Sequence, residues 1–163
     1  MTYGWAILVI AVVLSALFAL GVFNGNTISE NTCIATPGFL CKTPIYSHSD
    51  ANIIVTIGQS TGTSWTSANI VFVPQGTPNV NGVPSISFNS TPANTMLSVQ
   101  GMPTGATETL YLPVNSITFP VSIGTVEVGT IWAEYYYQVT SQGIEQTYGP
   151  AYVQIASLNL KAS

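Results

Sequence analysis

The chain opens with an unbroken apolar segment. Between Tyr3 and Phe23 there is no proline, no ionisable residue other than the tyrosine, and only Ser15 as an internal polar group. Apolar residues fall on every face of the helix that this segment would form, which is typical of a helix buried in lipid or inside a large assembly. Such a helix is about 31 Å long at ~1.5 Å per residue, which matches a hydrocarbon core of ~30 Å. The pattern therefore predicts a long apolar α-helix over residues 1–23.

A linker and a disulfide loop are predicted for residues 24–50. The glycine and asparagine residues around Asn24 are helix-stop signals, and a polar stretch follows them. Cys33 and Cys41 enclose a Pro-Gly turn, so the chain can double back and bring the two sulfur atoms together. In an exported chain a disulfide is favoured over two free buried thiols, and it would add roughly 2–3 kcal/mol to the stability.

The remainder of the chain, residues 51–163, has the pattern of β-structure. Gly129–Thr140 is the clearest strand, because the odd-numbered residues from Ile131 to Val139 alternate with a second set that begins at Trp132. The pair Asn81-Gly82 is a tight-turn signal inside a predicted loop. That loop is Asn79–Pro84, and the other predicted strands are Ile53–Ile57, Ile70–Val73, Ser85–Phe88, Met96–Val99, Thr109–Leu112, Ile117–Ile123 and Ala151–Leu160.

Several short strands with turn residues between them indicate an immunoglobulin-like β-sandwich. The predicted fold class is therefore α+β: a long apolar N-terminal α-helix followed by an all-β sandwich head. The predicted division is residues 1–23 for the helix, 24–50 for the linker and disulfide loop, and 51–163 for the head.

The chain has few charged residues, which argues against a nucleic-acid-binding protein. Charged residues make up 5% of the chain, the formal net charge is −4, and the only cations are Lys42 and Lys161. Two cations cannot neutralise a run of phosphates, so we expect no nucleic-acid partner. No Lys or Arg precedes Lys42, and the apolar run is longer than the core of a secretory signal peptide. A signal peptide is therefore disfavoured, while a membrane anchor stays open although it usually has a basic flank.

No catalytic, cofactor or metal site is predicted, and we expect the chain not to be an enzyme. His48 lies in a Tyr-Ser-His-Ser-Asp run, but the members of a catalytic triad converge from separate segments. His48 is the only histidine and the chain has two cysteines, which disfavours zinc. The six carboxylates show no calcium-loop spacing.

Two further features have alternative interpretations. Asn89 begins an Asn-Ser-Thr acceptor for N-glycosylation, although the proline at position 92 weakens this case and an unmodified loop is the alternative. Six aromatic residues could mark a sugar-binding face, but alternation along a strand places half of such residues in the core. We therefore favour core and subunit contacts for the six, which are Trp132, Tyr135, Tyr136, Tyr137, Tyr148 and Tyr152.

The apolar segment resembles the N-terminal helix of archaeal type IV pilins. The resemblance is carried by residues 1–14, MTYGWAILVIAVVL, and continues to Phe23, so it covers about a seventh of the chain. Gly129–Tyr135 and Ile155–Ala162 also resemble the last strands of such proteins. The residues that often precede Tyr-Gly-Trp in relatives, including a glutamate, are missing here. Either leader cleavage falls at Met1, or the sequence begins partway into the mature protein.

The resemblance implies a structural subunit of an extracellular pilus that serves adhesion or surface attachment. It implies a membrane-inserted precursor, a prepilin peptidase, an assembly ATPase and a membrane platform, and then a helical homopolymer at the cell surface that contacts a surface ligand. The alternative is a single-pass anchored β-sandwich that binds a ligand or joins a surface layer. The residues expected in the assembly core are Tyr3, Trp5, Ile7, Leu8, Ile10, Leu14, Leu17, Phe18 and Phe23.

The energetics of assembly can be estimated without the resemblance. Residues 7–23 contain twelve Ile, Leu, Val and Phe side chains. At ~1.5–3 kcal/mol each, exposing them to water would cost on the order of 20–35 kcal/mol, which is an upper estimate. This exceeds the ~4–15 kcal/mol of rigid-body freedom that association removes. Burial of this helix between subunits is therefore expected to make a filament practically irreversible.

Overall fold

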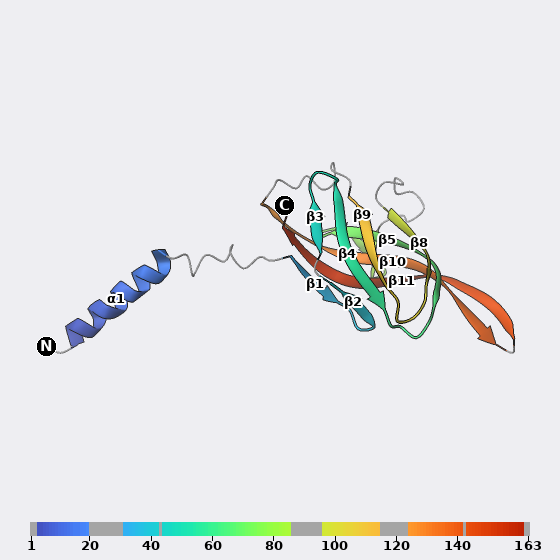
Figure 1. The fold of residues 1–163 in the computed structure, drawn as a ribbon, viewed down its shortest axis with the longest axis horizontal. Coiled ribbons are helices and arrows are strands. Elements are labelled where there is room, and N and C mark those ends of the chain that lie inside the picture. The colour runs from blue at the N-terminus through green and yellow to red at the C-terminus, as the bar shows by residue number, and fades with distance from the viewer. Residues whose placement is uncertain are drawn as a thin grey trace.

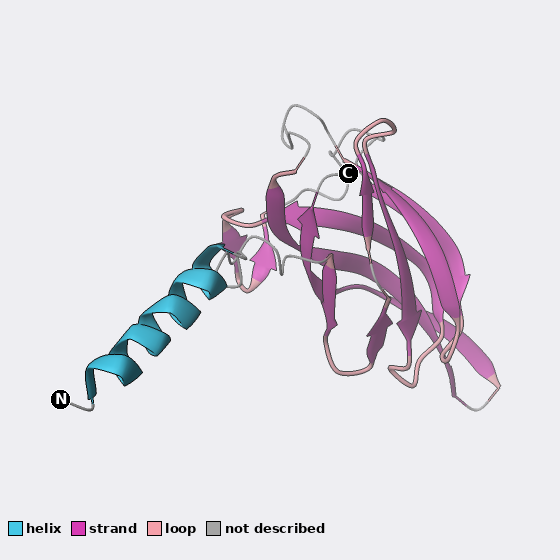
Figure 2. Ribbon diagram, turned by 60° about the vertical axis from the view of Figure 1, so that its left-hand side comes forward, coloured by secondary structure: helices cyan, strands magenta, loops and turns pink. Residues whose placement is uncertain are grey.

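The fold is a β-sandwich with one helix outside it (Figures 1 and 2). A computed structural model of the protein describes residues 3–19, 31–42, 44–85, 96–114, 124–141 and 143–161. Its elements are α1 (Tyr3–Ala19), β1 (Thr32–Ala35), β2 (Phe39–Cys41), β3 (Ile45–Ser47), β4 (Asn52–Gln59), β5 (Trp65–Pro74), β6 (Asn79–Val80), β7 (Val83–Pro84), β8 (Met96–Met102), β9 (Thr107–Pro113), β10 (Val126–Ser141) and β11 (Ile144–Lys161).

The strands form two main sheets, and all of their pairings are antiparallel. The larger sheet has the order β1-β11-β10-β5-β8. In the smaller sheet β2, β3 and β9 all pair with β4. The short strands β6 and β7 form a separate hairpin around Asn81-Gly82, where both residues have positive φ as a two-residue hairpin turn requires.

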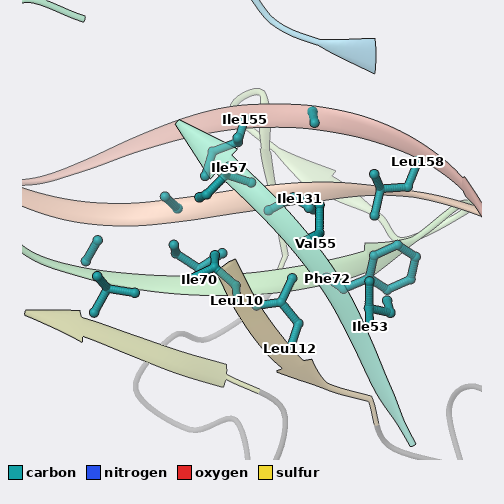
Figure 3. Packing of buried hydrophobic residues seen from close by; sticks show 14 of the residues in the cluster. Ile53, Val55, Ile57, Ile70, Phe72, Leu110, Leu112, Ile131, Ile155 and Leu158 are labelled. Atoms are coloured by element: carbon teal, nitrogen blue, oxygen red, sulfur yellow. The ribbon is translucent and has the colours of Figure 1, made fainter. Parts of the chain in front are cut away.

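The core lies between the two sheets (Figure 3). Side chains of β4 and β9 meet those of β5, β10 and β11, and alternate residues of each strand point inward because successive strand side chains face opposite ways. Fully buried members from both sheets include Ile53, Ile57, Ile70, Leu110, Leu112, Ile131, Ile155 and Leu158.

Gly129 has a packing role in this core. It is buried in β10 beneath the ring of Phe72. A Cβ atom at this position would lie 2.5 Å from the carbonyl oxygen of Val73 and would press on the Phe72 ring. Only glycine therefore allows β10 and β5 to pair at this point without a backbone shift.

A disulfide joins Cys33 and Cys41, as the sequence predicts, with 5.9 Å between their Cα atoms. Cys33 lies on β1 in the larger sheet and Cys41 on β2 in the smaller one, so the bond connects the two layers at one edge of the sandwich. Both cysteines pack against the main core. For a loop of this length the bond restricts the unfolded chain by about 2.5 kcal/mol.

The prediction of a long apolar N-terminal helix was wrong, and with it the α+β class. Helix α1 has 17 residues, where the sequence pattern extended it to Phe23. At ~1.5 Å per residue it is about 26 Å long, which is shorter than a hydrocarbon core of ~30 Å. No helix in the described residues is long and apolar enough to cross a membrane. The described residues form a mainly β protein with one short helix.

The predicted strands have different outcomes. The strands predicted at Ile53–Ile57, Ile70–Val73, Met96–Val99, Thr109–Leu112, Gly129–Thr140 and Ala151–Leu160 are present as parts of β4, β5, β8, β9, β10 and β11. Strands β1, β2 and β3 were not predicted, and they lie in the stretch interpreted as linker and disulfide loop. Two predicted strands were not tested. Ile117–Ile123 lies outside the described residues, and so does Ser85–Phe88 except for Ser85 itself.

Candidate assembly surface

Helix α1 presents its apolar side chains to solvent. None of its residues is buried, and Tyr3, Trp5 and Phe18 are exposed to 82%, 76% and 68%. The helix lies outside the two sheets in both views (Figures 1 and 2). A contiguous exposed apolar surface of this kind marks an interaction site in a folded protein.

Among the predicted assembly-core residues that the structure describes, all but Leu17 share this exposure. Leu17 is half-buried, and Phe23 lies outside the described residues. The members that α1 exposes are Tyr3, Trp5, Ile7, Leu8, Ile10, Leu14 and Phe18.

The serine hydroxyl of α1 and the absence of charge on this helix favour its burial. Ser15, the only hydroxyl-bearing residue of α1 apart from Tyr3, donates a hydrogen bond to the carbonyl oxygen of Val12 at 2.9 Å. This bond satisfies the hydroxyl within the helix, so its transfer to an apolar environment leaves no unpaired donor. The first and last turns contain no acidic or basic residue. Helix α1 can therefore be surrounded by apolar groups without the cost of burying a charge.

The Ser-His-Asp run does not form a catalytic arrangement. The Ser47 hydroxyl donates to the Asp50 carboxylate at 2.8 Å, so the histidine does not lie between them. The His48 ring is exposed and meets Tyr46 edge-on, with 6.5 Å between ring centroids. Within the described part of the chain no group of three His, Cys, Asp or Glu residues could hold a metal ion.

A row of polar side chains crosses the outer face of the larger sheet. The Glu134 carboxylate accepts hydrogen bonds from the Asn69 amide at 3.1 Å and the Tyr152 hydroxyl at 3.0 Å. The Ser98 hydroxyl donates to the Asn69 carbonyl oxygen at 2.8 Å, so the row links β8, β5, β10 and β11. Glu134 is only 4% exposed. Alternation along β10 places Glu134 on the outer face, but its burial depends on side chains from strands distant in sequence.

The predicted aromatic group divides between the two faces of β10. Tyr135 packs against the core, where its ring stacks on that of Trp65 with 4.5 Å between centroids. Trp132 packs on Val71 and Val73 on the other face, in a small cluster separate from the core. The division follows the period of two in the sequence. Tyr137 and Tyr148 stack on each other with 5.8 Å between centroids, at the point where β10 stops pairing with β5.

A hollow of about 420 Å³ lies beside the disulfide-bearing edge. Phe39, Leu40, Gln59 and Thr107 line it together with four glycine or alanine residues and a serine, and none of these is ionisable. The Gln59 amide is occupied structurally, since it donates to the carbonyl oxygens of Thr63 and Met102. The hollow therefore contains no group suited to acid–base or metal chemistry.

The candidate glycosylation residue Asn89 lies outside the described residues.

Three tyrosines give the fold a sensitivity to alkaline pH. Burial raises the pKa of Tyr46 and Tyr135, with a further contribution from Tyr137 to the latter. Burial, and then the hydrogen bond and charge of Glu134, raise the pKa of Tyr152. In each case the folded protein holds the proton more tightly than the unfolded chain, whose tyrosines titrate near pH ~10. The contribution of these tyrosines to the free energy of unfolding is complete below about pH 10, and it is lost as the pH rises through their pKa values in the folded protein.

We predict that the free energy of unfolding falls as the pH rises above about 10, and that Tyr46→Phe makes this fall shallower. Denaturant unfolding followed by circular dichroism at several pH values measures both slopes. Tyr111→Phe, at an exposed position on β9, is the matched control and should leave the slope unchanged. A wild-type stability that is flat over this range would contradict the prediction.

Comparisons with protein-family models, with curated proteins and with solved structures gave no match. The pilin resemblance and the immunoglobulin-like type of the sandwich therefore stay predictions from the sequence.

Proposed function

We propose that this chain is the structural subunit of an extracellular filament of the archaeal type IV pilus kind, which serves surface attachment. Subunits polymerise by packing their α1 helices together, with the sandwiches outside. The observation that supports this proposal most directly is the exposed, uncharged, apolar surface of α1. The peptidase, ATPase, membrane platform and membrane-resident precursor are expectations of the resemblance alone.

The described length of α1 is sufficient for this role. It contains nine Ile, Leu, Val and Phe side chains between Ile7 and Phe18. Their burial is worth on the order of 13–27 kcal/mol as an upper estimate, against ~4–15 kcal/mol of rigid-body freedom lost on association. Over most of these two ranges the gain exceeds the cost, which supports a stable polymer even though the helix is shorter than the sequence pattern suggested.

Electron microscopy of material sheared from cells tests the proposal. We expect thin fibres, and mass spectrometry of the purified fibres should identify this chain as the main component. Fractionation that recovers the chain only with the cell envelope, and never in fibres, would favour the anchored alternative and overturn the proposal.

A further inference from the structure

The hairpin β10–β11 extends beyond the sandwich as a two-stranded arm (Figure 1). The strand β10 pairs with β5 only as far as Tyr137, opposite Trp65. From there Gln138–Ser141 pairs only with Ile144–Thr147, and we call these two segments the arm. All eight residues are exposed.

Neither edge of the arm pairs with a further strand among the described residues. A two-stranded hairpin is marginally stable in water, and both of its edges carry unpaired backbone groups. Natural sheet edges are often protected by charged side chains, especially lysine, or by proline; the arm contains no lysine or proline, and Glu145 is its one charged residue. Its Val139 and Ile144 side chains are 41% and 62% exposed, which adds apolar surface at the tip.

The opposite end of the same two strands has complementary features. The single formal charge of the arm is Glu145, whereas Lys161 is one of only two cations in the chain and closes β11 at the other end. No ion pair joins either side chain to another described residue. Strand β1 also lies at the Lys161 end, as the outermost strand of the larger sheet, and its Ile34 is 71% exposed.

We propose that the arm of one copy adds to the free edge of β1 in the next copy, with Glu145 beside Lys161. This contact is β-strand addition, in which backbone hydrogen bonds extend the sheet of the receiving subunit. Because the two surfaces lie at opposite ends of β11, the contact is head-to-tail, and repeated along a filament it extends an open helical assembly instead of pairing two copies face to face. The inference rests on the proposed filament function and adds a contact between neighbouring sandwiches to the one made by α1.

Photo-crosslinking in filaments of the full chain tests this contact. A benzophenone amino acid at Val139 should give subunit-to-subunit products, and mass spectrometry should map them to residues 32–35 of the neighbour. The same amino acid at Tyr111, an exposed position on β9, is the control and should not reach those residues. Products from Val139 that map only to the smaller sheet, or an absence of subunit-to-subunit products, would overturn the proposal.

Charge reversal gives an independent readout. Glu145→Lys and Lys161→Glu should each lower the Val139 crosslink yield about fivefold, the size expected for an exposed ion pair, and the double variant should restore it. Single variants with unchanged yield, or a double variant without recovery, would contradict the Glu145–Lys161 contact. Failure of the wild-type chain to appear in fibres at all is a failure of the proposed function, whereas normal fibres without these crosslinks are a failure of the arm contact alone.

Discussion

Leu14→Asp should abolish filament formation. Leu14 lies in the middle of α1 with 45% of its surface exposed, so it is available to a neighbouring helix. In a bundle of apolar helices the new carboxylate would lose its hydration without gaining a cation, because α1 has none. The penalty for such a charge is several kcal/mol even after relaxation, and it recurs at every subunit.

Fibre yield by electron microscopy, normalised to the amount of subunit in the cells, measures this effect. Tyr111→Asp is the matched control, since it places the same charge at an exposed apolar position of β9. It should leave the yield within about twofold of wild type, because surface substitutions of this kind change stability little. Normal fibres from Leu14→Asp would show that α1 is not the assembly element.

Trp65→Ala should be the most destabilising single change among those considered in the sandwich. Trp65 is 2% exposed, and its ring stacks on that of Tyr135 in β10. The centroid of its ring lies 5.9 Å from that of Phe39 in β2, so the Trp65 side chain bridges the two sheets. Removing a buried tryptophan ring costs ~3–5 kcal/mol through lost burial and the cavity that remains. This corresponds to a fall in Tm of roughly 10–20 °C for a head of this size.

Two variants make the Trp65 measurement diagnostic. Trp132→Ala removes a tryptophan that packs only on the small outer cluster, and it should cost less than half as much. Trp65→Phe keeps an aromatic ring and removes the indole N–H, which is buried without a hydrogen-bond partner. Its loss should therefore be smaller than that of Trp65→Ala. Equal melting temperatures for Trp65→Ala and Trp132→Ala would contradict the bridging role.

The strongest sequence signals identified strands but not their partners. The alternation in Gly129–Thr140 predicted β10 and the inward or outward direction of its side chains, because a period of two is a local property. The burial of Glu134 was not predictable in the same way. It depends on Tyr152 and Asn69 standing opposite, and that register is set by pairing across 18 and 65 residues of chain.

The short elements were missed for a different reason. Strands β1, β2 and β3 have three or four residues each, too few to display a period, and β1 is held by β11 more than a hundred residues away. The helix was predicted to reach Phe23 because apolar composition continues past Ala19, and composition alone does not locate a helix end. The disulfide was predictable because the turn and both cysteines lie within nine residues.

The place of the disulfide has a mechanical consequence for a fibre built as proposed. Tension on α1 enters the sandwich at Thr32, and Cys33 is the next residue. The bond to Cys41 passes the load on to β2, so the eight peptide units between the cysteines cannot be drawn out, which withholds about 28 Å of extension. Pulling on β1 therefore loads the hydrogen bonds of β1 to β11 and of β2 to β4 together. Under force the two sheets must yield jointly, and the attachment of each subunit to the fibre stays short and stiff until they do.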